Sequence, residues 1–162
     1  MPEVGIGMGA NLGDRKAQIE AAAERLRLLA KTDTKTSYPF RISEILESQP
    51  INCPEGSPPF LNAVSVFDTT LSPLSLLDAL QTIETDFGRP KNRLKNAPRN
   101  IDLDLLYYDN LTLSSQRLDL PHPRIFERFF VLLPLSQVDP KRILPEQNIT
   151  VLELYKQFTN NK

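Results

Sequence analysis

The order in which strand-like and helix-like hydrophobic patterns follow one another is the feature that most limits the fold of this chain. Apolar residues at every second position indicate a strand, whereas a spacing of three to four residues indicates a helix. Strands are predicted at residues 4–8, 36–47, 60–68 and 101–108, the second of them interrupted or edged at Pro39. Helices are predicted at residues 14–30, 72–88, 126–133 and 151–158. The leading β-α-β-β-α-β order favours a ferredoxin-like α+β sandwich with an antiparallel sheet.

Local signals mark several boundaries of these elements. Ser72 and Pro73 form a helix start, because serine caps the first turn and proline is well tolerated at the first helical position. Gly88 is a typical helix end. Residues 48–59 and 89–99 are expected to be long loops, and in a compact domain such loops are usually lids or binding loops. We therefore expect a single domain over residues 1–162 with two functional loops.

Composition excludes several classes of protein. The net charge of −1 gives the chain as a whole no electrostatic attraction to nucleic acid or to an anionic membrane. No apolar run approaches the roughly 18 residues that a bilayer-spanning helix needs, and the N-terminus carries no visible secretory signal. The single cysteine, Cys53, has no partner for an internal disulfide. We expect a cytoplasmic monomer that binds neither nucleic acid nor membranes.

Two aspartates in the last long predicted strand are the most informative residues. Side chains alternate along a strand, so Asp102 and Asp104 share one face. Their Cα atoms are expected about 6.6 Å apart, and two carboxylates that close both stay ionised when a cation sits between them. Carboxylate ligands favour Mg²⁺, which completes its coordination with water and phosphate oxygens. The alternative is a solvated strand face, although aspartate is depleted in strands.

The segment before this strand carries the opposite charge. Its basic residues, with no acidic residue among them, are Arg89, Lys91, Arg93, Lys95 and Arg99. Phosphoryl transfer needs such cations because negative charge spreads over phosphoryl oxygens in the transition state. A basic loop alone is also typical of a solvated surface or a nucleic-acid patch. Its position directly before two carboxylates favours a site for polyphosphate and Mg²⁺.

Other candidate residues give weaker signals. Glu84 lies near the edge of the apolar stripe of its helix, where it is either partnered or an ordinary surface glutamate. His122, the single histidine, stands between two prolines that limit its backbone, although an inert loop histidine is the commoner case. Phe60 and Asn62 share a strand face, and Phe130 follows downstream. This combination suits a flat heterocycle, while core packing is the simpler explanation of both phenylalanines.

Several motifs, in the same order along the chain, resemble those of the hydroxymethyldihydropterin pyrophosphokinase family. The most specific is the run KNAPRNIDLDLL at residues 95–106. The shorter ones are GANLGD at 9–14, FLNA at 60–63, GR at 88–89, LPHPR at 120–124, RFF at 128–130 and PL at 134–135. The resemblance covers residues from about 4 to 146.

That resemblance implies a ferredoxin-like fold and transfer of pyrophosphate from ATP to 6-hydroxymethyl-7,8-dihydropterin, giving the pterin diphosphate and AMP in folate biosynthesis. It implies two Mg²⁺ ions held by Asp102 and Asp104, with Arg89 and Arg99 as catalytic residues. The positions that match the ATP site are Glu84, Lys91, Leu105, Arg117, His122 and Arg128. Those that match the pterin pocket are Ser48, Ile51, Phe60, Asn62 and Phe130.

Two other functions fit parts of the sequence. The run from Gly5 to Ala10 matches the G-x-G-x-x-A pattern of dinucleotide oxidoreductases, but its first two glycines lie inside the predicted strand rather than after it. A ferredoxin-like RNA-binding module would use the basic segment, but it needs aromatic residues in the RNP pattern, which this sequence lacks. No Walker A motif is present, so arginines and metal would have to hold the phosphates.

Overall fold

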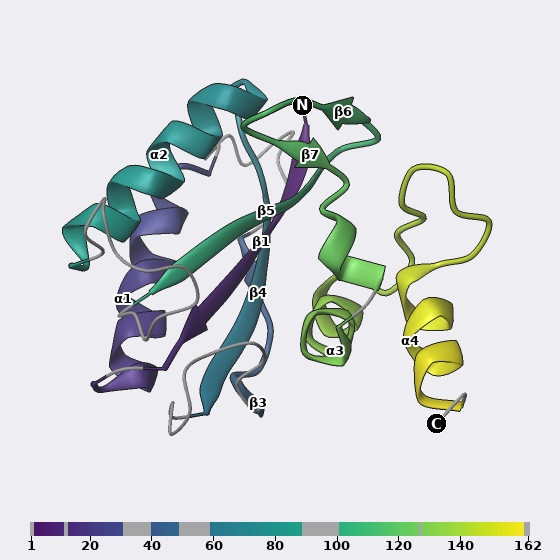
Figure 1. Ribbon diagram of the computed structural model, residues 1–162, viewed down its shortest axis with the longest axis horizontal. Helices are drawn as coiled ribbons and strands as arrows, with labels where there is room; N and C mark the ends of the chain where they lie inside the picture. Colours follow the sequence, from purple (N-terminus) through teal and green to yellow (C-terminus); the bar gives the residue numbers. More distant parts are fainter. Residues whose placement is uncertain are drawn as a thin grey trace.

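Two layers of helices enclose a central sheet in the computed structural model, which describes residues 2–11, 13–30, 40–48, 59–88, 101–126 and 128–160. The elements are β1 (Glu3–Ala10), α1 (Arg15–Arg27), β2 (Arg41–Ile42), β3 (Leu46–Ser48), β4 (Phe60–Asp68), α2 (Pro73–Asp86), β5 (Asp102–Tyr108), β6 (Leu113–Ser114), β7 (Asp119–Leu120), the 3₁₀ turn η1 (Pro123–Phe126), α3 (Phe129–Val138) and α4 (Val151–Asn160). Helices α1 and α2 lie on one side of the sheet, and α3 and α4 lie on the other (Figure 1). The predicted ferredoxin-like α+β fold is confirmed.

Strand β1 lies inside the sheet, between β4 and β5. Within the described residues the strand order is β2-β4-β1-β5, with β3 also paired to β4, and all of these neighbours are antiparallel. Strands β6 and β7 form a separate two-stranded ribbon. Residues directly opposite one another in antiparallel strands share a face. The register of β1 therefore determines which residues of β4 and β5 lie on either side of each β1 residue.

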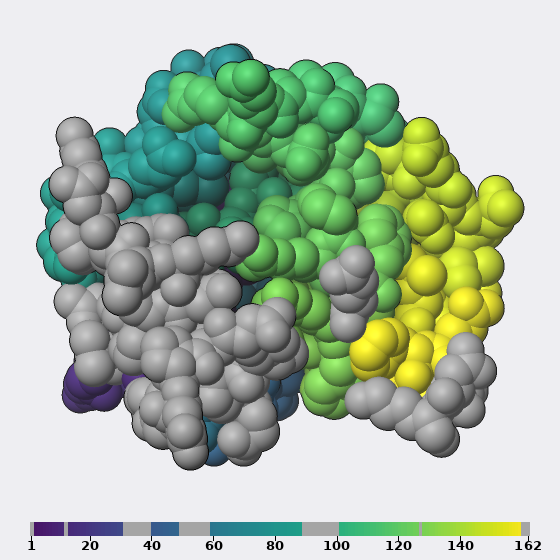
Figure 2. All heavy atoms as spheres, in the orientation of Figure 1, coloured from purple at the N-terminus to yellow at the C-terminus, as the bar shows by residue number. Residues whose placement is uncertain are grey.

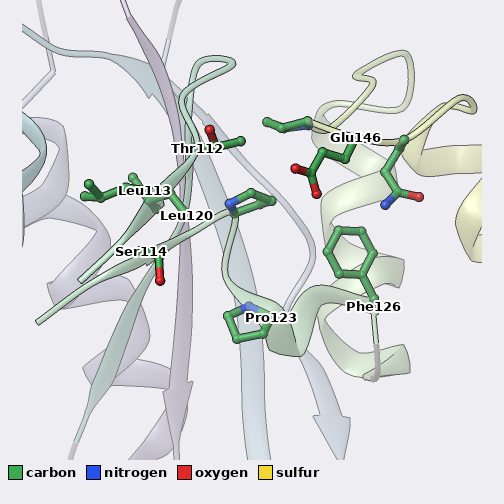
Figure 3. Close-up of a pocket in the computed structure, with 10 residues that line it drawn as sticks. Thr112, Leu113, Ser114, Leu120, Pro123, Phe126 and Glu146 are labelled. Atoms are coloured by element: carbon green, nitrogen blue, oxygen red, sulfur yellow. The ribbon is translucent and has the colours of Figure 1, made fainter. Parts of the chain in front are cut away.

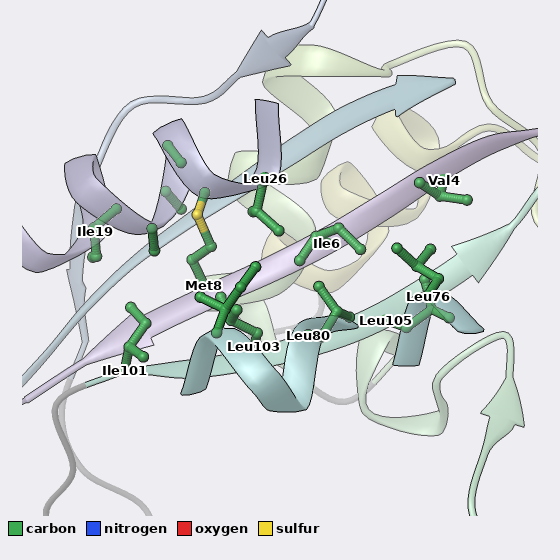
Figure 4. Packing of buried hydrophobic residues seen from close by; sticks show 14 of the residues in the cluster. Val4, Ile6, Met8, Ile19, Leu26, Leu76, Leu80, Ile101, Leu103 and Leu105 are labelled. Atoms are coloured by element: carbon green, nitrogen blue, oxygen red, sulfur yellow. The ribbon is translucent and has the colours of Figure 1, made fainter. Parts of the chain in front are cut away.

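The face of the sheet toward α1 and α2 is apolar. Val4, Ile6 and Met8 of β1 point toward these helices and pack with Leu26 of α1 and Leu80 of α2 (Figure 4). All five side chains are at most 2% exposed. Burial of each such side chain contributes roughly 1.5–3 kcal/mol, so this layer supplies a large part of the stability.

The opposite face of β1 carries glycine in place of these apolar side chains. Gly5 lies against the ring of Tyr107, and a Cβ added there would stand 2.5 Å from Tyr107 Cε1, closer than real carbon atoms approach. Gly7 lies against Leu106, whose Cδ2 would be 3.4 Å from an added Cβ. Tyr107 and Leu106 belong to a second buried cluster, together with side chains of α3 and α4. Gly5 thus makes room for the Tyr107 ring, whereas an alanine at position 7 would be in ordinary van der Waals contact with Leu106.

Glu3 of β1 anchors a cluster of charges beside this second core. Its carboxylate accepts hydrogen bonds from Arg41 at 2.7 Å and from Arg142. Arg142 Nε also donates to Asp139 Oδ2 at 2.6 Å, and the same oxygen accepts from the Tyr107 hydroxyl at 2.7 Å. Burial, and then the charge of Asp139, raise the pKa of Tyr107 well above its ordinary value, so the hydroxyl remains a donor. The cluster ties the connection between α3 and α4 to β1 and β5.

The capping signals of α2 are confirmed. The Ser72 Oγ accepts a hydrogen bond from the backbone N–H of Ser75 at 3.3 Å, and Pro73 is the first helical residue. Gly88 follows the helix with a φ of 93°, the left-handed conformation that a side chain disfavours. Short-range chemistry therefore sets both ends of this helix.

The strand predicted over residues 36–47, interrupted or edged at Pro39, differs from the structure after Pro39. Residues 36–39 lie outside the described part of the chain, and the remainder is divided into β2 and β3. Between them, the Ser43 N–H donates to the Val64 carbonyl at 2.9 Å, while the Val64 N–H donates to Ser43 Oγ at 2.9 Å. The serine hydroxyl replaces a backbone carbonyl as the acceptor, and this interrupts the regular ladder.

Two predicted helices also differ in extent. Helix α1 ends at Arg27, earlier than predicted, and α3 covers Phe129–Val138 rather than 126–133. Helix α3 continues past Pro134, which removes one helical hydrogen bond. Burial of Leu132 and Leu135 against the sheet side, at 2% and 0% exposed, offsets this cost. In the described ranges, no helix is long and apolar enough to cross a membrane.

We expect Tyr107→Phe to lower the free energy of unfolding by about 1.5–3 kcal/mol, because the lost hydrogen bond has a charged acceptor. The matched control is Tyr108→Phe. The Tyr108 hydroxyl donates to the neutral Leu71 carbonyl at 2.6 Å, so its loss should cost about 0.5–1.5 kcal/mol. Urea unfolding measures both variants. Equal losses, or a larger loss for Tyr108→Phe, would contradict the importance of the Glu3 cluster.

Candidate active site

Predicted metal and pterin residues lie in adjacent rows on the sheet face away from α1 and α2. Gly9 of β1 pairs with Asn62 of β4 on one side and with Asp102 of β5 on the other. The next row on the same face contains Gly7 with Asp104. Asn62 and Asp102 are therefore separated by a single strand, which corresponds to about 10 Å. The register brings together residues that are 40 positions apart in the sequence.

Asp102 and Asp104 are both half-buried at the start of β5. The described residues contain no group of three or more His, Cys, Asp or Glu side chains that could hold a metal ion. A cation at the two aspartates would therefore need further ligands from water or from a substrate. That donor set fits Mg²⁺, which typically takes one or two carboxylates and completes its shell with water and phosphate oxygens.

Glu84 holds the backbone between these two aspartates. It lies near the end of α2, and only 5% of it is exposed. Its Oε2 accepts a hydrogen bond from the backbone N–H of Leu103 at 2.8 Å. Strand β5 is the last in the strand order of the described residues, and this N–H takes its partner from outside the sheet. A carboxylate from α2 supplies it and fixes the strand that carries Asp102 and Asp104.

The predicted pterin residues on β3 and β4 are linked to one another. Asn62 is 7% exposed, and its Nδ2 donates to the Ser48 Oγ at 2.6 Å. This bond turns the amide oxygen toward Gly9, where an added Cβ would stand 3.4 Å from Oδ1 and 3.5 Å from Phe60 Cδ1. Phe130, at the start of α3, lies under the guanidinium of Arg128 at 5.4 Å. An amide edge and aromatic surface suit a flat heterocycle.

His122 is held in one tautomer. Its backbone N–H donates to the Leu106 carbonyl at 2.7 Å, and its Nδ1 accepts from the Arg124 backbone N–H at 3.1 Å. A neutral ring that accepts at Nδ1 carries its proton on Nε2. Burial lowers the pKa of His122, and the charges of Arg124 and Arg128 lower it further, against an opposing effect of Asp102. The ring is thus a neutral donor among arginines and near an aspartate.

Two predicted ATP-site residues lie around α2 and β5. Arg117 donates to Asp78 Oδ1 at 2.5 Å and to Gln81 Oε1 at 3.4 Å, so it rests on the exposed surface of α2. Leu105 is 2% exposed and belongs to the core toward α1 and α2. Figure 2 shows a hollow in the surface between α2 and the green segment around β7 and η1. The predicted residues Ile51, Arg89, Lys91 and Arg99, and the basic Arg93 and Lys95, lie outside the described residues.

A separate cavity of about 570 Å³ opens between the β6–β7 ribbon and the loop before α4 (Figure 3). Leu113, Leu120 and Phe126 line it, and Glu146 projects from the far side. None of its lining residues was predicted to be a site residue, although Pro121 and Pro123 flank His122. The constellation around Asp102, rather than this cavity, is therefore the candidate active site.

Sequence reasoning did not single out Gly9 or the contact of Glu84 with Leu103. A signal for Gly9 was available, because three glycines alternate at positions 5, 7 and 9 within a predicted strand, and strand glycines often mark close approach of a ligand or another backbone. The partner of Glu84 had no such signal, since the contact depends on how α2 docks against β5.

Comparison with known proteins adds independent information. Residues 5–140 match the family described as 7,8-dihydro-6-hydroxymethylpterin-pyrophosphokinase. The chain is 37% identical over 157 residues to a 2-amino-4-hydroxy-6-hydroxymethyldihydropteridine pyrophosphokinase of Haemophilus influenzae, covering 97% of this chain and 93% of the relative. It is 38% identical over 141 residues to the protein of the same name from Pseudomonas aeruginosa, covering 87% and 83%.

Solved structures agree on the fold. A crystal structure of HPPK-DHPS in complex with substrates matches with a TM-score of 0.75 at 14% identity, covering 99% of this chain and 44% of that chain. Plasmodium falciparum HPPK-DHPS with pterin and p-hydrobenzoate matches with a TM-score of 0.72 at 16% identity, covering 99% and 45%. This chain thus spans less than half of those solved chains. Since the family match extends over residues 5–140 and the two bacterial relatives align along most of their length, the chain belongs to the 7,8-dihydro-6-hydroxymethylpterin-pyrophosphokinase family.

Proposed function

We propose that this chain transfers pyrophosphate from ATP to 6-hydroxymethyl-7,8-dihydropterin at the site built around Asn62, Gly9 and Asp102. Pyrophosphokinase activity in folate synthesis follows from its family. The assignment of residues is supported chiefly by the register, which sets an amide suited to the pterin edge one strand away from a carboxylate suited to Mg²⁺. In the reaction, the pterin hydroxyl attacks the β-phosphorus of ATP, the bond from that phosphorus to the AMP oxygen breaks, and the hydroxyl proton is released.

Asp102 and Asp104 are the residues that would hold Mg²⁺, and two ions is the number we propose. When bound, the metal would neutralise phosphate charge and polarise the attacked phosphorus. We assign the Nε2–H of His122 and the guanidinium of Arg128 to the phosphate oxygens. The tautomer of His122 and the effect of Asp102 and Arg128 on its pKa support this assignment. We propose that Arg89 and Arg99 stabilise the negative charge of the transition state and that Lys91 binds ATP. All three belong to the basic segment before β5.

The pterin is assigned to the β3–β4 side of the site. Asn62 would bond the polar edge of the ring, with Ser48 holding the amide in place at 2.6 Å. Phe60 and Phe130 would stack on the ring faces, and Ile51 would complete the pocket. We place the chain in the cytoplasm as a monomer.

The product distinguishes this reaction from ordinary kinase chemistry. Incubation of the protein with Mg·ATP and hydroxymethyldihydropterin should release AMP together with the pterin diphosphate. Chromatography of the nucleotides measures the result. ADP in place of AMP would contradict pyrophosphate transfer.

We expect Asp102→Asn and Asp104→Asn each to lower kcat by about 100-fold or more, a loss typical for removal of a preorganised charge-stabilising group. Both variants should fold normally, because each removes one of two neighbouring like charges. Asp109→Asn is the control: it changes a carboxylate at the far end of the same strand, in a left-handed conformation (φ 50°) that asparagine also tolerates. Initial rates at several Mg²⁺ concentrations test the assignment, and near-normal rates in both site variants would refute it.

His122 should titrate below pH 6.5, its ordinary value. Because the chain has one histidine, a single imidazole signal in proton NMR reports the midpoint. Arg128→Gln should raise this midpoint, since it removes one repelling charge. The folded chain binds the proton less tightly than the unfolded chain, so this group's contribution to stability is lost as the pH falls below 6.5. A midpoint at or above 6.5 would show that the ring does not lie in this environment.

Asn62→Ala should weaken pterin binding by about tenfold, because a polar edge left unpaired in the pocket costs ~1–3 kcal/mol, and it should leave ATP binding unchanged. Ser48→Ala should give a smaller loss, since the amide remains but loses its hydrogen-bonded orientation. Calorimetric titration with the pterin, in the presence of a non-hydrolysable ATP analogue, measures both. Equal losses for ATP and pterin would indicate a folding defect instead.

A further inference from the structure

The three glycines on one face of β1 do not have the same environment. An added Cβ at Gly5 would stand 2.5 Å from Tyr107 Cε1, so packing of the second core requires this glycine. At Gly7 the nearest neighbour of an added Cβ would be Leu106 of the same core, at an ordinary contact distance of 3.4 Å. Gly9 instead lies beside two predicted pterin residues: an added Cβ would be 3.4 Å from Asn62 Oδ1 and 3.5 Å from Phe60 Cδ1. These are ordinary van der Waals distances. Among the described residues, nothing in the packing prevents an alanine at this position.

Backbone conformation does not require glycine at position 9 either. The positive-φ glycines of the described residues are Gly13 and Gly88, whereas Gly9 is an extended residue paired to both neighbouring strands. Glycine inside a strand is less favourable than alanine, because glycine loses more conformational freedom on folding. Alanine would therefore stabilise the sheet here, and the reason for glycine is to be sought in the ligand.

The position of Gly9 suggests what that ligand needs. Asn62 lies one strand to one side and Asp102 one strand to the other. Under the proposed function, on which this inference rests, the pterin ring is held at Asn62 and the phosphates are held at Asp102. The hydroxymethyl arm that joins ring to phosphate must then cross the sheet above Gly9.

We infer that Gly9 is a specificity-determining residue, which keeps the sheet surface free of a side chain so that the 6-hydroxymethyl arm of the pterin reaches the ATP phosphates. Glycine in a strand is typical of places where a ligand approaches the backbone closely. A methyl group at position 9 would occupy the path of the arm while leaving the ring edge and the metal ligands in place.

The test compares Gly9→Ala with Gly7→Ala, the preceding glycine on the same face, whose added Cβ would meet Leu106 at 3.4 Å. Gly9→Ala should unfold at the same urea concentration as the parent chain or a higher one. Its dissociation constant for hydroxymethyldihydropterin, measured with a non-hydrolysable ATP analogue present, should rise about tenfold, as expected for one overpacked methyl group. The dissociation constant for the ATP analogue alone should not change.

A second ligand distinguishes a steric clash with the hydroxymethyl group from a general loss of pterin binding. For 7,8-dihydropterin without the hydroxymethyl group, Gly9→Ala should bind almost as tightly as the parent chain. Gly7→Ala should bind both pterins normally. Unchanged binding of hydroxymethyldihydropterin by Gly9→Ala, or equal losses in both alanine variants, would overturn the inference and leave the proposed function standing. Failure of the parent chain to bind the pterin would overturn the proposed function, and the inference with it.

Discussion

Strand β1 is hydrogen-bonded along both of its edges, and its register against β4 and β5 determines what each face of the sheet can do. On one face, its alternate residues are large and apolar and pack against α1 and α2. On the other, they are Gly5, Gly7 and Gly9, which leave that face to the side chains of the neighbouring strands. A slip of one residue would exchange the two faces. If β1 slipped, its apolar side chains would leave the helices, and if β5 slipped, Asp102 and Asp104 would be buried under the helices.

Charged side chains are arranged differently at the two ends of the sheet face that lies away from α1 and α2. At one end, two acids and two arginines of the Glu3 cluster neutralise one another within the fold. At the other, Asp102 lies within electrostatic reach of His122, which also senses Arg124 and Arg128. A negative carboxylate on β5 and positive groups after β7 thus both act on His122. That separation suits a bound metal–polyphosphate, whose cation and anionic oxygens each find the opposite charge.

Local chemistry in the sequence predicted much of this fold, because it acts over a few residues. The cap of Ser72, the glycine at 88 and the alternation over residues 60–68 all gave correct elements. The failures involve contacts between distant segments. The division of the strand at Ser43 depends on Val64 across the sheet, and the passage of α3 through Pro134 depends on burial against the sheet. Alternation likewise placed Asp102 and Asp104 on one face, but the pairing of Gly9 with Asn62 and Asp102 is a matter of register, which no local pattern encodes.

The contact between Glu84 and Leu103 shows how the site can stand at the edge of a sheet. The outer N–H groups of an edge strand need acceptors, and another strand is the usual way to supply them. An added strand would, however, lie alongside Asp102 and Asp104, the residues proposed to bind Mg²⁺. A buried carboxylate is costly by itself, but here it accepts a backbone hydrogen bond at 2.8 Å. Glu84 of α2 thereby accepts the hydrogen bond of the Leu103 N–H. This N–H, between Asp102 and Asp104, therefore needs no acceptor from another strand.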